Sequence, residues 1–253
     1  MLPALRLNDQ IALALGVLGL LFLLINLLRL RKNKLPHLPA PAKDAVASLV
    51  HASSEEGKRL VVSLGHNLTS GYFDLAGASG LSLQRALLKR SLFNDYPLQS
   101  FSGDGVLACL SRMVVHGAYR GALASELFNG TLSRLSGAAP AAYAVSLVNQ
   151  LPDPDNAGLL LAGQMSPMLL LALDQADRRS LPAVSAIASL SGQAAGFFGN
   201  SVCLMGEDVF DAAGKLDQRK PVLASLSAQD WLRVAISLGL LIGAVLKMGG
   251  MLP

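Results

Sequence analysis

Polar residues that could bind a ligand stand in short glycine-containing turns, each directly after a predicted β-strand. A histidine can transfer protons or bind a ligand, and glycine lets a ligand approach backbone N–H groups. Ligands of open α/β sheets bind beyond the carboxyl ends of the strands, which is where these turns would lie. The candidate ligand-binding residues are Gly65, His66, Asn67, Ser102, Gly103, Asp104, Gly105, Ser166, Glu207 and Asp208.

Several of these residues have a second interpretation as helix caps. Asp104 precedes a predicted helix and is a good N-cap, and Ser166 is followed by Pro167, which is typical of the first helical position. Glu207 and Asp208 suit the positive end of a helix dipole. The pattern favours capping over ligand binding for Asp104, Ser166 and Glu207.

The stretch 103–108, GDGVLA, fits the loose dinucleotide fingerprint G-x-G-x-x-A. Its context is wrong for a Rossmann nucleotide site, because it follows the second predicted strand and the next strand ends at 135–137 without an acidic residue. Asp104 would also repel a phosphate. We therefore expect no cofactor and interpret this turn as a capped helix start.

No catalytic or metal-binding pattern is predicted. The motifs G-x-S-x-G, H-E-x-x-H and G-x-x-x-x-G-K-[ST] are missing from the sequence. Of the four histidines, only His66 follows a predicted strand. The pattern favours the interpretation that His66 is a loop histidine with satisfied hydrogen bonds. Cys109 and Cys203 lie in apolar runs without metal-ligand spacing, and we predict that both are small buried residues.

Short β-like runs alternate with helical runs between residues 44 and 226. This alternation of about six β–α units predicts an α/β fold: a Rossmann-like, mainly parallel sheet with helices on both faces. In the helix predicted for 105–120, the apolar face would contain Val106, Leu107, Leu110, Met113, Val114 and Gly117. The predicted strands are 59–65, 97–102, 131–137, 157–163, 181–189 and 200–206, and the predicted helices 82–93, 105–120, 140–151, 166–179, 192–199 and 207–214.

Residues 1–34 are predicted to form an N-terminal transmembrane anchor. Charged residues make up only 15% of the 253 residues, and the run 11–28 contains none. The length of this run is about enough to span a bilayer as a helix. Its basic stop consists of Arg29, Arg31, Lys32 and Lys34, and this asymmetry places that side in the cytoplasm. A cleaved signal peptide is the alternative, although its charges would precede the apolar region. The proline-rich residues 35–43 are predicted to be a linker.

Residues 227–253 are predicted to form a C-terminal transmembrane helix. Trp231 and Arg233 suit the membrane interface, and Gly239 with Gly243 forms a G-x-x-x-G pattern that lets a partner helix approach closely. The alternative is an amphipathic tail that lies in the interface. With two spans, the domain 44–226 would face the cytoplasm and both termini would lie outside.

The order of several segments resembles a bacterial family labelled domain of unknown function 6754. The segments are RLVVSLG, QSFSGDGVLACLSRMVVHGAYR, APAAYAVSLV, LLLAGQMSPMLLLALDQADR, CLMGEDVFDAAGKL and ASLSAQDWLRVAISLGLLIGAVL, over about residues 55–248. The resemblance implies a protein of the bacterial cytoplasmic membrane with a cytoplasmic α/β domain ahead of a terminal helix, and it implies no activity. At His66-Asn67 the chain departs from the glycine-rich turn of that family, which argues against a backbone-only anion site there.

Two functions are predicted. The first is a structural or assembly subunit, anchored in the lipid bilayer and forming a homo-oligomer, because the sequence contains no catalytic pattern. The alternative is a small-molecule or nucleotide-binding domain, or an enzymatic one, that would use His66, Asp104 and Glu207 at the strand ends. Nucleic acid is not expected as a partner, because the net charge is only +4 and aromatic residues make up 5%.

Overall fold

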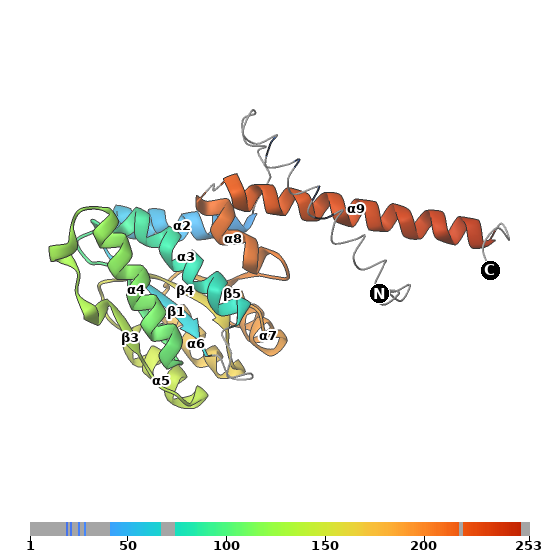
Figure 1. Ribbon diagram of the computed structural model, residues 1–253. Helices are drawn as coiled ribbons and strands as arrows, with labels where there is room; N and C mark the ends of the chain where they lie inside the picture. Colours follow the sequence, from blue (N-terminus) through green and yellow to red (C-terminus); the bar gives the residue numbers. More distant parts are fainter. Residues whose placement is uncertain are drawn as a thin grey trace, which may run out of the picture. The chain divides into compact units, whose positions relative to one another are not determined.

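The computed structural model describes residues 41–66, 74–217 and 220–248, together with residues 19, 21, 25 and 28. The chain divides into two units (Figure 1). One unit is Ala40–Asp217, and the other combines Met1–Pro39 with Gln218–Pro253. The candidate ligand-binding residues all belong to the first unit, with Asn67 outside the described residues.

Six parallel strands form one sheet in the order β3-β2-β1-β4-β5-β6. The chain builds outward from β1 to β3 and then returns to β4, so the direction of winding reverses between β1 and β4. This is the strand order of Rossmann folds, and it confirms the predicted α/β architecture. The strands are β1 (Arg59–Gly65), β2 (Gln99–Ser102), β3 (Ser133–Leu135), β4 (Asn156–Gln164), β5 (Ala183–Ile187) and β6 (Val202–Leu204).

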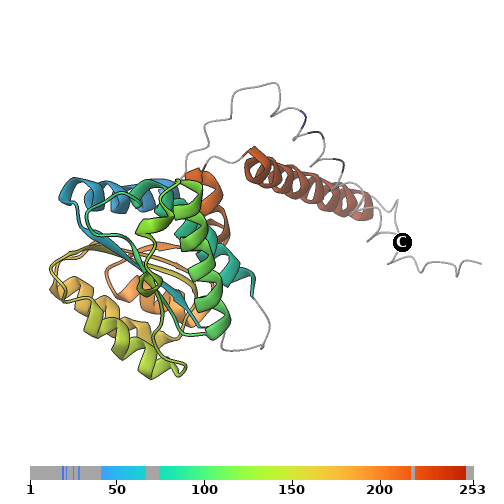
Figure 2. The ribbon, with the colours of Figure 1, turned by 60° about the vertical axis from the view of Figure 1, so that its left-hand side comes forward.

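Two layers of helices cover the two faces of the sheet (Figure 2). Residues of β4 alternate between the layers: Leu160 and Ala162 pack in one core, and Leu159 and Leu161 in the other. The first core contains α2 (Pro41–Glu56), α3 (Leu75–Ser91), α4 (Gly105–Gly121) and α8 (Asp208–Asp217). The second contains α5 (Pro140–Gln150), α6 (Leu170–Arg178) and α7 (Leu190–Phe198), with the short helix η3 (Pro167–Leu169) before α6.

The first two helices of the unit differ from the sequence predictions. Helix α2 was not predicted, and it begins at Pro41, inside the predicted linker 35–43, because proline is tolerated in a first helical turn. Helix α3 begins at Leu75, before the predicted 82, with Ala76, Gly77 and Gly80 buried. Small residues such as these are typical of loops, but here they let the helix approach the sheet closely.

The buried face of α4 also differs from the prediction. It consists of Leu107, Ser111, Val115 and Tyr119, which recur every four residues. Of the predicted face only Leu107 is buried, whereas Met113 and Gly117 are exposed. Ser111 can face inward because Gln84 Nε2 donates to its hydroxyl over 2.8 Å and Ser100 Oγ lies 2.8 Å away. Of the rest of the predicted stripe, Leu110 and Val114 are half-buried against the core, and Val106 is exposed.

The predicted membrane spans are not confirmed. A search of the described residues finds no helix that is both long and apolar enough to cross a bilayer. The N-terminal run 11–28 lies almost entirely outside those residues, as do Arg29, Arg31, Lys32 and Lys34. The last helix, α9 (Lys220–Met248), begins before the predicted 227 and contains Trp231, Arg233, Gly239 and Gly243. Both spans stay predictions.

Candidate functional site

A small crevice lies at the carboxyl ends of β1 and β4, where the strand order reverses. This is where doubly wound sheets bind their ligands. The crevice is lined by His66, Asp74, Gly77, Leu107 and Gln164. Between the described residues it is too narrow to admit a water molecule, and the imidazole of His66 packs against Gly103 at this place.

His66 is the central side chain of this crevice. It directly follows β1, is only 2% exposed, and its backbone N–H donates to Gln164 O over 2.8 Å. Within the described part of the chain, neither Nδ1 nor Nε2 has a hydrogen-bond partner. Burial lowers the pKa of His66, while the backbone of Gly103 and the charge of Asp104 oppose this shift. The imidazole is therefore neutral at physiological pH.

Tyr143, from α5, lies beside His66 and bonds to the ends of two strands. Its ring packs edge-on against His66, with ring centroids 4.4 Å apart. Its hydroxyl donates to Phe101 O over 3.0 Å, accepts from Gly65 N over 3.1 Å, and lies 2.6 Å from Ser63 Oγ. Burial raises the pKa of Tyr143 to about 12 in spite of these hydrogen bonds, so the phenol stays protonated. One side chain thus ties α5 to the ends of β1 and β2.

Two of the predicted glycines are needed for packing around His66. Gly103 N donates to Gly65 O over 2.8 Å, and a Cβ at Gly103 would overlap His66 Nδ1. Gly65 has φ +73°, and a Cβ there would overlap Gln164 O. The absence of a side chain at these positions accommodates the imidazole and the neighbouring strand, and it does not open a space for a ligand.

The capping interpretation is confirmed for Asp104 and Ser166. The Asp104 carboxylate accepts from Val106 N over 2.7 Å and from Leu107 N over 3.1 Å, at the start of α4. Ser166 Oγ accepts from Met168 N over 3.4 Å, at the start of η3. Both oxygens satisfy backbone donors that a helix leaves unpaired in its first turn.

The structure brings only some of the predicted residues together. Gly65, His66, Gly103 and Asp104 are neighbours, and Ser102 is buried directly beside Gly103. Gly105 follows as the first residue of α4. Glu207 and Asp208 follow β6, which β5 separates from β4, and they are not among the residues that line the crevice.

Sequence reasoning missed Tyr143, Asp74 and Gln164. Tyr143 lies inside a helix with no motif around it, and only the tertiary fold aims its hydroxyl at the strand ends. The prediction that Cys109 is buried is wrong, because this residue lies on the exposed side of α4, and Cys203 is half-buried. Among the described residues, no group of three or more His, Cys, Asp or Glu could hold a metal ion.

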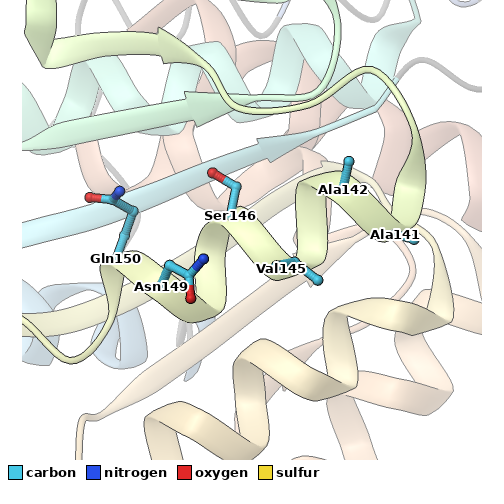
Figure 3. A pocket seen from close by; sticks show the side chains of 6 residues that line it. All are labelled: Ala141, Ala142, Val145, Ser146, Asn149 and Gln150. Carbon is cyan, nitrogen blue, oxygen red and sulfur yellow. The ribbon is translucent and has the colours of Figure 1, made fainter.

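Another hollow lies on the outer face of α5 (Figure 3). Figure 3 shows that every residue lining it comes from this one helix, among them Val145, Ser146 and Asn149. Because a single helix cannot enclose a ligand, we regard it as a shallow surface feature.

No protein-family model, curated protein or solved structure matches this chain. The resemblance to the bacterial family therefore stays a prediction, and the interpretation of the site rests on its geometry.

Proposed function

We propose that this protein is a non-enzymatic, membrane-anchored α/β scaffold subunit that self-associates in the plane of the bacterial cytoplasmic membrane. The observation that carries the proposal is the apolar surface beside the open edge of the sheet. At this edge β6 has β5 as its neighbour and no strand on its other side among those described. An unpaired edge strand offers a row of backbone donors and acceptors to another chain.

Exposed apolar side chains flank this edge strand. Phe197 and Phe198, at the end of α7, are 68% and 80% exposed, and Val202 on β6 is 54% exposed. The two rings pack edge-on with centroids 6.0 Å apart. Adjacent exposed aromatic residues typically mark an interface, because apolar rings that stay in contact with water add no burial energy to the fold. We define Phe197, Phe198 and Val202 as the edge patch.

A second copy of the chain is the partner that this surface fits best. Two edge strands related by a two-fold axis can pair with each other, and the edge patches then meet across the same axis. The predicted anchors at both ends of the chain would hold the copies in one plane and raise their effective concentration. The closed crevice between β1 and β4 is consistent with a role that needs no small ligand.

Native mass spectrometry of the full chain in a mild nonionic detergent tests this proposal. We expect a fixed multiple of the 26.4 kDa chain with no retained ligand. The double variant Phe198→Asp/Val202→Asp should shift the population to smaller species, because like charges would then meet across the two-fold axis of an apolar surface. The control Leu123→Asp changes a residue that is 90% exposed outside the edge patch, and it should keep the wild-type assembly. A monomeric wild-type protein would overturn the proposal.

The alternative function, small-molecule binding at the crevice, is favoured by one observation. His66 is buried beside Asp74 and Gln164 with neither ring nitrogen paired among the described residues, and a polar ligand could supply the missing hydrogen bonds. In the same mass spectra, a reproducible extra mass that disappears in His66→Ala and persists in Asp208→Ala would support this alternative. It would require the crevice to open.

A further inference from the structure

A groove between α3 and α4 is much larger than the crevice at the strand ends. Its volume is about 630 Å³, within the range of about 300–1,000 Å³ that is usual for small-molecule sites. The groove lies on the outer side of the helix layer and is built entirely from residues of α3, of α4 and of the turns that follow them. It is separate from the edge patch, which belongs to α7 and β6.

The groove is apolar because α4 carries an apolar stripe that the core covers only in part. Leu110, Met113 and Val114 line the groove. Leu110 and Val114 are half-buried and also pack against the core, whereas Met113 is 68% exposed. Opposite them, Phe93 follows α3 and is 72% exposed. The outer side of a surface helix is ordinarily polar, so the exposed part of this stripe needs a separate physical reason.

Small residues keep the groove open. Gly117 and Gly121 lie one turn apart on α4, and a Cβ at either position would have no atom within 4 Å. Each glycine lowers the stability of a helix relative to alanine, and neither has a positive φ that would require it. Their effect on the surface is to leave a space that a larger side chain would fill.

The charged residues that line the groove are all cationic. Arg85 and Lys89 stand one turn apart on α3, and no Asp or Glu is among the lining residues. Arg85 is exposed, and the long apolar stems of both side chains extend the groove wall. The complementary ligand has one apolar chain and one anionic head, with the head at Arg85.

We propose that the α3–α4 groove binds a long-chain fatty carboxylate, with its acyl chain against Met113 and Gly117 and its carboxylate beside Arg85. A single acyl chain can lie along a groove whose two walls are helices. This inference goes beyond the proposed scaffold function and does not rest on it.

Photolabelling of the full chain tests the assignment. The protein is placed in nanodiscs of zwitterionic phosphatidylcholine, and a diazirine-bearing hexadecanoate is the probe. We expect labelled peptides from 81–93 and 105–121. Gly117→Leu should lower their labelling by about tenfold or more, and Arg85→Glu should do the same, which corresponds to about 1.4 kcal/mol of binding.

The controls separate binding from folding and from charge. Gly117→Ala adds only a Cβ and should keep most of the labelling. Arg179→Glu makes the same charge change at an exposed site after α6, on the other face of the sheet, and should label like wild type. Gly117→Leu should stay folded by circular dichroism, because leucine is a good helix former and the space above Gly117 is empty.

A cationic probe with the same chain should leave the groove peptides unlabelled. A phosphatidylglycerol that carries the diazirine on one acyl chain distinguishes a membrane lipid from a free fatty acid. Labelling of the groove by this phospholipid alone, or equal labelling in wild type and Gly117→Leu, would overturn the proposal.

Discussion

The crevice between β1 and β4 and the groove between α3 and α4 are opposites. The crevice stands where the strand order predicts a ligand, yet it is polar, filled and too narrow for water. The groove stands where the strand order predicts nothing, yet it is apolar, open and about 630 Å³ in volume. The strand order alone therefore does not decide where a ligand can bind, because a few side-chain volumes decide where there is room for one.

Glycine has opposite effects in the two places. At Gly103 the imidazole of His66 occupies the space that a side chain would take, so the crevice is closed there. At Gly117 nothing replaces the missing side chain, so the glycine opens the groove. Substitutions at these positions, and at their neighbours, are therefore the most direct ways to test the comparison.

The largest effect is expected for Gly103→Ala. The new Cβ would overlap His66 Nδ1 inside a filled crevice, and we expect a loss of about 3 kcal/mol in the free energy of unfolding. Urea denaturation followed by circular dichroism measures it. Gly105→Ala is the matched control, because a Cβ there meets no atom and should cost nothing.

The double variant Gly103→Ala/His66→Ala sharpens this test. If the overlap is the cause, the two effects are far from additive, and the double variant is more stable than the sum of the singles predicts by about 1 kcal/mol or more. Additive losses would show that the crevice is not closed by this contact.

The next largest effect is expected for Tyr143→Phe. The substitution removes the hydroxyl that serves Gly65 N, Phe101 O and Ser63 Oγ, and it leaves buried polar groups without a partner. We expect a loss of about 1–3 kcal/mol in the same denaturation experiment. The control Tyr96→Phe removes the same atom from a partly exposed ring and should change stability by less than about 0.5 kcal/mol. Equal effects would contradict the role of Tyr143 at the strand ends.

A smaller effect of the opposite sign is expected at the groove. Gly117→Ala should raise the free energy of unfolding by about 0.5–1 kcal/mol, because alanine loses less backbone entropy in a helix and meets no neighbour. Gly80→Ala, on the adjacent helix, should instead be destabilising, because its Cβ would lie 3.3 Å from Ala162 O. If both were destabilising, Gly117 would not be an open position.

The smallest effect is the pH dependence that His66 introduces. Burial lowers the pKa of His66 from 6.5. Below pH 6.5 this histidine is therefore protonated in the unfolded chain before it is protonated in the folded chain. Stability should fall as the pH drops from about 6.5 to the folded pKa and then level off. His66→Gln should flatten this slope, and the exposed His116→Gln should leave it unchanged.

The sheet was largely predictable because its strands carry local signals. The run LLLA in β4 indicates burial on both faces, and Asp104 stands where an N-cap is needed, so both were placed correctly. The buried face of α4 was not predictable from periodicity, since Ser111 looks polar until Ser100, Ser133 and Gln84 are seen to pair with it.

The crevice was predictable only as a location. His66 and Gly103 follow neighbouring strands, so the sequence could place them at one edge of the sheet. That the imidazole fills the space of a missing side chain depends on a tertiary contact between residues far apart in the chain, and so does the reach of Tyr143 from α5. The groove was not predictable, because Leu110 and Val114 line it and also pack against the core, so their apolar pattern indicates only a core-facing side.

The fit of His66 against Gly103 also constrains how this chain can diverge. Neither position can change freely alone: a side chain at 103 collides with the imidazole, and a smaller residue at 66 leaves a void beside Tyr143. Descendants of this sequence that acquire a larger residue at 103 should therefore carry a smaller one at 66. Such a paired exchange would keep the crevice filled, whereas a smaller residue at 66 beside an unchanged Gly103 would open a space at this edge of the sheet.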